Sequence, residues 1–212
     1  MSDTTAPTRT VAVVSAGLSQ PSSTRMLADQ LAAATRDALT ERGVRVELPV
    51  VEVRDHAHAV VDHTLTGFPP AGLEPVMTTL TSADGLIAAT PTFNASYSGL
   101  FKTLFDLLPE DALTGVPVLI AATGGTPRHS LVLDHALRPL FSYLRAVVVP
   151  TGVFAGPDDW AGGAAEGLLR ERINRAATEL ADEVARRPPR RPTDPFALPA
   201  SFEELLGRGG QS

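Results

Sequence analysis

A short apolar run that stops at a proline most constrains the fold of this chain. Residues 85–90, GLIAAT, are small, apolar or β-branched, which is typical of a strand that is covered on both faces. Pro91 follows directly, lacks an N–H for a sheet hydrogen bond and restricts the preceding residue to an extended conformation. We therefore expect a buried strand that ends there, a stiff loop at residues 91–94, and a helix that begins at about Ser96 or Ser98.

Strand-like and helix-like segments alternate along the rest of the chain. Strands are predicted at residues 10–15, 44–53, 85–90, 118–123 and 146–154. This alternation predicts an α/β fold, a flavodoxin-like doubly wound sheet of five parallel strands in the order 2-1-3-4-5. In such a sheet the first and third strands flank the topological switch point, where ligands bind at the carboxyl ends of the strands.

Length and composition suit one globular domain. The chain has 212 residues, of which 43% are hydrophobic, enough for one sizeable core. We expect a flavodoxin-like domain at residues 1–187 and an extended C-terminal tail at 188–212, because the tail is rich in proline and arginine and only briefly apolar. Cysteine is absent, which excludes disulfides and cysteine nucleophiles and fits a reducing cytoplasm.

Charge and hydropathy narrow the range of partners. A net charge of -6 argues against nucleic acid or an anionic membrane, because both reward clustered positive charge. No apolar run reaches the length of about 18 residues that a membrane helix needs, and the first ten residues lack the basic start and apolar core of a signal peptide. A soluble cytoplasmic protein is the expectation.

The segment between the first strand and the first helix is a candidate anion site. Unpaired N–H groups and the helix dipole meet there, and the segment from Ala16 to Thr24 supplies many neutral donors but no P-loop lysine. This favours a phosphate monoester, as in flavin mononucleotide (FMN), over a triphosphate with magnesium. The alternative is that Ser22 or Ser23 only caps the helix. The candidate residues are Ser15, Ser19, Gln20, Ser22, Ser23 and Thr24.

Two further loops follow the third and fourth predicted strands. Phe93 offers an aromatic face, and Thr92 and Asn94 offer donors and acceptors, so the first of these loops suits a flat ring with polar edges. The paired glycines of the second loop let the backbone approach a ligand, or simply turn the chain. His129 would face the same site or cap the next helix. The candidate residues are Pro91, Thr92, Phe93, Asn94, Thr123, Gly124, Gly125 and His129.

Two helical segments carry further signals. The helix near residues 98–108 has more large apolar residues than one sheet face needs, which predicts a subunit interface. In the helix at residues 129–146, Pro139 cannot bond to the carbonyl of His135, so a kink or π-bulge is expected there. His135 is either a modulator of the site or an ordinary interface residue.

His56, His58 and His63 lie close together in the sequence. We expect them to lie on a surface segment rather than to bind a metal.

Three long motifs, PTFNASYSGLFKTLFDLLPEDAL, ATGGTPRHSLVLDHALRPLFSYLRA and PTGVFA, resemble the NADPH-dependent FMN reductase family, especially the reductase components of two-component flavin monooxygenases. The resemblance to the sulfonate-linked reductases covers Val11 to Ala155. The subfamily that serves luciferase-like monooxygenases is more similar and includes the tail. The resemblance implies FMN and NADPH (or NADH) as cofactors, a luciferase-like flavin-dependent monooxygenase as partner, and a homodimer or homotetramer.

The resemblance also implies positions for the flavin. Ser19 to Thr24 would surround the phosphate, Pro91 to Asn94 would line the isoalloxazine, and Thr123 to Gly125 would approach its other edge. This chain has Gln20 where many relatives have an arginine, and His135 where sulfonate-linked relatives often have a tyrosine.

The predicted function is therefore hydride transfer between two stacked rings, with no side chain acting as acid or base, followed by release of reduced FMN. One alternative is a quinone or azo-dye reductase that retains its FMN. The other is a non-enzymatic electron carrier like flavodoxin, against which the 5% aromatic content and the mild charge argue.

Overall fold

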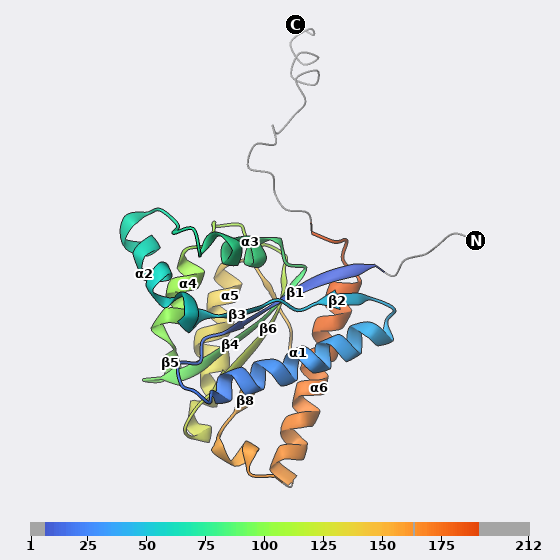
Figure 1. The fold of residues 1–212 in the computed structure, drawn as a ribbon. Coiled ribbons are helices and arrows are strands. Elements are labelled where there is room, and N and C mark those ends of the chain that lie inside the picture. Colours follow the sequence, from blue (N-terminus) through green and yellow to red (C-terminus); the bar gives the residue numbers. More distant parts are fainter. Residues whose placement is uncertain (1–6, 163, 191–212) are drawn as a thin grey trace, which may run out of the picture.

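A twisted parallel sheet runs through the centre of the molecule, with its main strands in the order β2-β1-β4-β6-β7 (Figure 1). The computed structural model describes residues 7–162 and 164–190. The strands are β1 (Thr8–Ser15), β2 (Arg45–Glu47), β3 (Val50–Glu52), β4 (Gly85–Phe93), β5 (Ser96–Tyr97), β6 (Pro117–Thr123), β7 (Val147–Val148) and β8 (Val153–Ala155). The predicted fold class is confirmed, because β2 and β3 together flank β1, and β7 and β8 together flank β6.

Within the described residues the sheet has eight strands rather than five, because both outer strands are divided and a short hairpin strand, β5, is added beside β4. Leu48 and Pro49 separate β2 from β3, and Pro49 has no N–H to give to the ladder. Its carbonyl still accepts a hydrogen bond from the Val13 N–H at 2.9 Å. Between β7 and β8 the Thr151 N–H donates to the Glu179 carboxylate instead of to a strand.

The expectation that the central strand ends at Thr90 was wrong. β4 continues to Phe93, and its last two residues pair in antiparallel fashion with β5. The turn between them, Asn94 and Ala95, has φ angles of 47° and 67°, as the two central residues of a type I′ hairpin turn require. The ladder with β6 continues as far as Pro91 and pairing with β5 begins at Thr92, so the missing donor of Pro91 does not end the strand.

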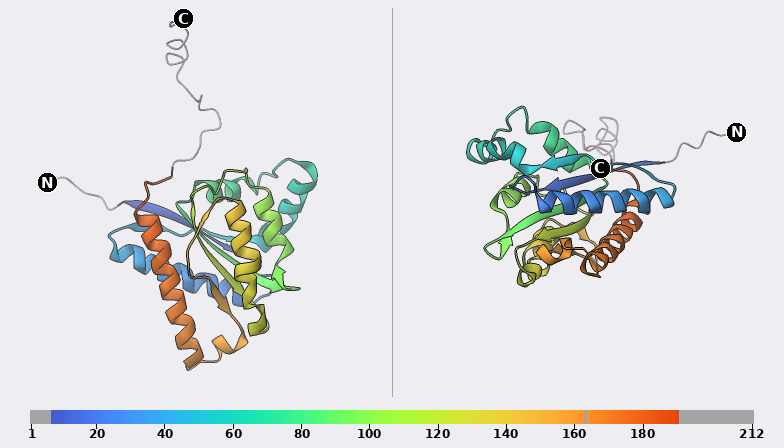
Figure 2. Two further views of the ribbon diagram at one scale, coloured as in Figure 1. Left: turned by 180° about the vertical axis from the view of Figure 1, so that it is seen from behind. Right: turned by 60° about the horizontal axis from the view of Figure 1, so that its bottom comes forward.

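Helices cover both faces of the sheet (Figures 1 and 2). One core lies between the sheet and α1 (Ser23–Glu41) and α6 (Ala164–Ala185). The other core lies under α2 (Ala57–Thr66), α3 (Glu74–Ser82), α4 (Gly99–Asp106) and α5 (Arg138–Tyr143). Alternate residues of β1 enter opposite cores, which is the period-two pattern of a strand buried on both faces.

The predicted helix at residues 129–146 is in three parts. A 3₁₀ helix, η2 (Pro127–Leu131), leads into one π turn, η3 (Leu133–Leu137), and then into α5. The departure from α geometry expected near His135 is therefore confirmed, and Pro139 lies in the first turn of α5, where its missing N–H is tolerated.

After α6 the chain returns to the amino-terminal end of β4. The Arg190 N–H donates to the Asp84 carboxylate at 2.6 Å, and its guanidinium donates to the carbonyl of Ala112 at 2.9 Å. Arg190 is partly buried there, and this burial lowers its pKa. The rest of the predicted tail, residues 191–212, lies outside the described residues.

Among the residues that the structure describes, no helix has the length and hydropathy needed to cross a bilayer.

Candidate functional site

A cleft of about 480 Å³ opens at the carboxyl ends of β1, β4, β6 and β8, within the usual range of about 300–1,000 Å³ for small-molecule sites. This is the switch-point edge where an open α/β sheet binds ligands. It is lined by Gly17, Leu18, Ser19, Ser23, Thr24, Pro91, Thr92, Phe93, Thr123, Gly124, Gly125, Ala155, Gly156, Pro157 and Trp160.

The structure brings most of the predicted site residues together. Ser19, Ser23 and Thr24 from the first loop meet the segments at 91–93 and 123–125 across the cleft. The remaining predicted residues do not line it: Ser15, Gln20, Ser22, Asn94, His129 and His135. Ser15 is buried within β1, Asn94 lies in the hairpin turn, and His135 is exposed on the π turn.

The first wall of the cleft is the loop that leads into α1. Ser22 is the N-cap of α1, and its Oγ accepts a hydrogen bond from the Arg25 N–H at 3.2 Å. A Cβ on Gly17 would lie 1.9 Å from this Oγ, so the loop can close on the cap only with glycine there. The first-turn N–H groups and the dipole of this 19-residue helix favour an anion at Ser23 and Thr24.

The second wall is the end of β4. Thr92 is only 8% exposed, and its Oγ1 is buried without a hydrogen-bond partner among the described residues. Buried hydroxyls are normally paired, so a water or a ligand is expected to complete the hydrogen bonding of this one. Phe93 is 46% exposed beside it. A flat, mainly apolar ring with polar edges matches this combination.

The third wall is the turn after β6. A Cβ on Gly124 would lie 3.0 Å from both the His129 Cβ and the Phe154 Cζ, so a side chain here would have to push these neighbours back by a few tenths of an ångström. A Cβ on Gly125 would meet nothing within 4 Å. This wall therefore presents backbone to the cleft, and His129 supports it from behind through Gly124.

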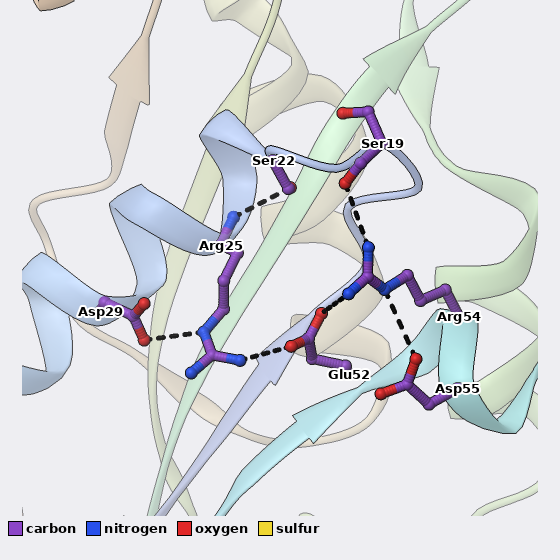
Figure 3. Close-up of polar contacts among 7 residues, drawn as sticks. All are labelled: Ser19, Ser22, Arg25, Asp29, Glu52, Arg54 and Asp55. Atoms are coloured by element: carbon purple, nitrogen blue, oxygen red, sulfur yellow. Dashed lines mark hydrogen bonds and ion pairs between the residues drawn. The ribbon is translucent and has the colours of Figure 1, made fainter.

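A cluster of charged residues lies behind the first loop (Figure 3). Arg25 pairs with Asp29 at 2.8 Å and with Glu52 at 2.5 Å, and Glu52 also pairs with Arg54 at 3.0 Å. The hydrogen bond to Asp29, with a contribution from Glu52, raises the pKa of Arg25. Neither arginine lines the cleft.

Sequence reasoning missed the rim that follows β8. Gly156, Pro157 and Trp160 complete the cleft from a short 3₁₀ helix, η4 (Pro157–Trp160). The signal was present, since this segment follows the fifth predicted strand and its carboxyl end must lie beside that of the fourth. The chain's one tryptophan stands there.

The three histidines that follow the second predicted strand do not form a metal site. His56 ends a 3₁₀ helix, η1 (Val53–His56), and His58 and His63 lie on α2. Among the residues that the structure describes, no three His, Asp or Glu side chains come together as a metal site.

Comparison with known proteins gives a consistent result. The family model of the NADPH-dependent FMN reductases matches residues 9–161. An FMN reductase (NADPH) of Pseudomonas aeruginosa is 43% identical over 74% of this chain and 81% of its own length. The NADH-dependent FMN reductase SfnE of Pseudomonas putida is 39% identical over 71% of this chain and 78% of its own length.

A solved structure agrees with the sequence comparisons. An oxidoreductase from Corynebacterium diphtheriae superimposes with a TM-score of 0.83 at 49% identity, covering 85% of this chain and 99% of that protein. The residues matched by the family model include all three walls of the cleft and the rim at Trp160.

Proposed function

This chain belongs to the NADPH-dependent FMN reductase family and is an NAD(P)H:FMN oxidoreductase, and we propose that it reduces FMN for release to a flavin-dependent monooxygenase of the luciferase-like type. The observation that carries the proposal is the cleft itself. The N-terminus of α1, Thr92 at the end of β4 and a turn of bare backbone line one space of suitable volume.

The residues present fit FMN. Ser19, Ser23 and the N–H groups that open α1 would hold the phosphate, with Thr24 in the same wall. Pro91 and Phe93 would support the ring, and the Thr92 hydroxyl would donate to one of its polar edges. The backbone at Gly124 and Gly125 would approach the opposite edge.

Bound FMN supplies the acceptor for the hydride of NAD(P)H, and the protein contributes orientation. The exposed Phe93 and the rim residues Leu18 and Trp160 leave an apolar opening over the ring position, where a nicotinamide would stack. No acid or base is needed for a hydride that passes directly between two rings. Holding the rings in contact distance is therefore the catalytic contribution of this chain.

Release of reduced FMN to a second enzyme requires modest affinity for the flavin. Ser19, Ser23 and Thr24 are neutral, and neither Arg25 nor Arg54 lines the cleft. A phosphate site made of neutral donors and a helix dipole binds more weakly than one with a fixed cation. This supports a flavin that is exchanged rather than retained.

Steady-state oxidation of NADPH and of NADH, followed at 340 nm with and without excess FMN, tests the proposal. We expect turnover to depend on added FMN, and flavin to separate from the protein on gel filtration. Flavin that stays bound stoichiometrically while a quinone is reduced would instead establish a quinone or azo-dye reductase. Failure to oxidise either nucleotide at any flavin concentration would contradict reductase activity.

We also propose that the enzyme is a cytoplasmic homodimer or homotetramer. Leu131 and Tyr143 are 60% and 77% exposed on the two ends of the segment that carries the π turn. Both side chains would be covered if this segment packed against a second copy of the chain. Light scattering coupled to gel filtration gives the mass directly, and a monomer at micromolar concentration would contradict the proposal.

A further inference from the structure

We propose that Arg54 is a positioning residue for the phosphate loop, Gly17 to Ser22: it holds this loop from behind and thereby sets the affinity for the phosphate of FMN without touching it. The inference rests on the proposed function, since it concerns the same cleft. It assigns a role to an arginine that comes from η1, the 3₁₀ helix that follows β3, and that the flavin site does not otherwise use.

Arg54 contacts the loop at two adjacent residues. Its Nη1 donates to the carbonyl of Ser19 at 3.1 Å, across 35 positions of sequence. With the amide of Gln20 oriented so that its oxygen meets the guanidinium, that oxygen accepts from Nη1 and Nη2 at 3.0 and 2.6 Å. Ser19 lines the cleft and Gln20 does not, so Gln20 turns its side chain away from the ligand space and toward Arg54.

The guanidinium itself is held in place. Arg54 pairs with Glu52 at 3.0 Å and lies 3.4 Å from Asp55, with its side chain only 20% exposed (Figure 3). Glu52 is the last residue of β3. The loop is therefore tied to the end of a sheet strand, which is among the most rigid parts of the fold.

The same carboxylate reaches the other end of the loop. Glu52 accepts from Arg25 at 2.5 Å, and the N–H of Arg25 donates to the cap residue Ser22. One carboxylate thus connects the loop at Ser19, through Arg54, with the start of α1. The cap residue Ser22 and the approach to Ser23, which lines the cleft, lie between these two fixed points.

Geometry rather than charge is the means by which Arg54 acts. The two guanidiniums of the cluster face three carboxylates, those of Asp29, Glu52 and Asp55. These carboxylates compensate the positive charge of the two guanidiniums. Because the guanidiniums also lie outside the cleft, their charge is screened from a ligand phosphate. A planar guanidinium presents its donors in a rigid fork and can hold a carbonyl, an amide and a carboxylate in one fixed geometry, whereas the ammonium of a lysine is a point charge on a flexible stem.

The test is equilibrium binding of FMN and of riboflavin, which lacks the phosphate, to the wild-type enzyme and to Arg54→Ala. Flavin fluorescence quenching measures both dissociation constants without turnover. We expect the affinity for FMN to fall about tenfold or more and the affinity for riboflavin to change less than about twofold. Loss of affinity for both flavins alike, or for neither, would overturn the proposal.

Arg42→Ala is the matched control. Arg42 also donates to a main-chain carbonyl, that of Ala38 at 2.5 Å, and to a carboxylate, that of Asp182 at 2.7 Å, but it lies far from the cleft. We expect it to leave both affinities unchanged. If Arg42→Ala also lost affinity for FMN but not for riboflavin, the result with Arg54→Ala would no longer support the proposal.

Two further measurements separate positioning from direct charge. The salt dependence of FMN binding should be the same in wild type and in Arg54→Ala, because no phosphate contact is removed; a shallower dependence in the variant would overturn the proposal. Glu52→Gln, a milder change, should weaken FMN binding by loosening Arg54, whereas tighter binding would show that the arginine charge acts on the phosphate. Failure of the wild type to bind FMN would instead contradict the proposed function.

Discussion

The hydroxyls of Thr24 and Thr123, 99 positions apart in sequence, share a buried hydrogen bond of 2.7 Å. Thr24 lies in the first turn of α1, and Thr123 is the last residue of β6. The two threonines are 2% and 4% exposed, and both line the cleft. This bond joins the wall that would hold the phosphate to the wall that would approach the ring, and it fixes the width of the cleft between them.

Replacing Thr123 with valine should lower the free energy of unfolding by about 1–2 kcal/mol, because the Thr24 hydroxyl would remain buried without its partner. The double variant Thr24→Val/Thr123→Val should be less destabilised than the sum of the two single variants, since both polar groups are then removed. Urea denaturation of all four proteins in the absence of flavin measures the coupling. Strict additivity would show that the two hydroxyls do not interact.

Ser22 and Ser23 are adjacent and should nevertheless respond differently to substitution. Ser22→Ala removes the N-cap of α1 and should cost about 1 kcal/mol of stability. Ser23→Ala removes a donor from the cleft wall, and it should weaken FMN binding about tenfold while stability changes by less than about 0.5 kcal/mol. Thermal unfolding and flavin titration on the same two variants give the comparison. Equal effects in both assays would contradict the separate roles.

Gly17→Ala should weaken FMN binding by more than about tenfold. The new Cβ would fall 1.9 Å from Ser22 Oγ, so the cap and the loop cannot both keep their positions. Gly99→Ala is the control, because a Cβ there meets nothing within 4 Å and the residue begins a different helix, α4. Fluorescence titration with FMN should show wild-type affinity for the control and a marked loss for Gly17→Ala.

Asp84→Asn should destabilise the fold by about 1–3 kcal/mol. The two carboxylate oxygens accept from the N–H groups of Thr10 at 2.8 Å and Arg190 at 2.6 Å, and an amide would place its own NH₂ against one of these donors. Asp106→Asn is the control: this residue pairs with Lys102 on the exposed surface of α4, where such a pair contributes at most about 0.5 kcal/mol. Chemical denaturation at pH 7 distinguishes the two variants.

The division of the outer strands and the extension of β4 past Pro91 depended on distant partners. The outer strands resume at Val50 and Val153 because β1 and β6 lie beside them. The local sequence does not indicate these partners. Phe93 pairs because Ser96 turns back onto it. The sequence showed that Pro91 lacks an N–H donor. Whether the strand ended there depended on the residues that pair with Thr92 in the folded chain.

The cation that holds the phosphate loop could not be found from sequence. Arg54 stands 35 positions from Ser19 in a segment that reads as polar surface, and only the parallel pairing of β3 with β1 places it behind the loop. In the same way, Trp160 joins the cleft only because β8 lies beside β6.

By itself the sequence determined the layered α/β fold, the departure from α geometry near His135 and the three strand-end loops that meet in the cleft. Each follows from backbone chemistry that acts over a few residues: apolar runs, a missing N–H, glycines without a Cβ. The tertiary structure decided which side chains face the ligand space and which are used to hold the walls. The cap of Ser22 on the Arg25 N–H is local, but Gln20 turns toward Arg54, and that contact exists only once the sheet has brought the two segments together.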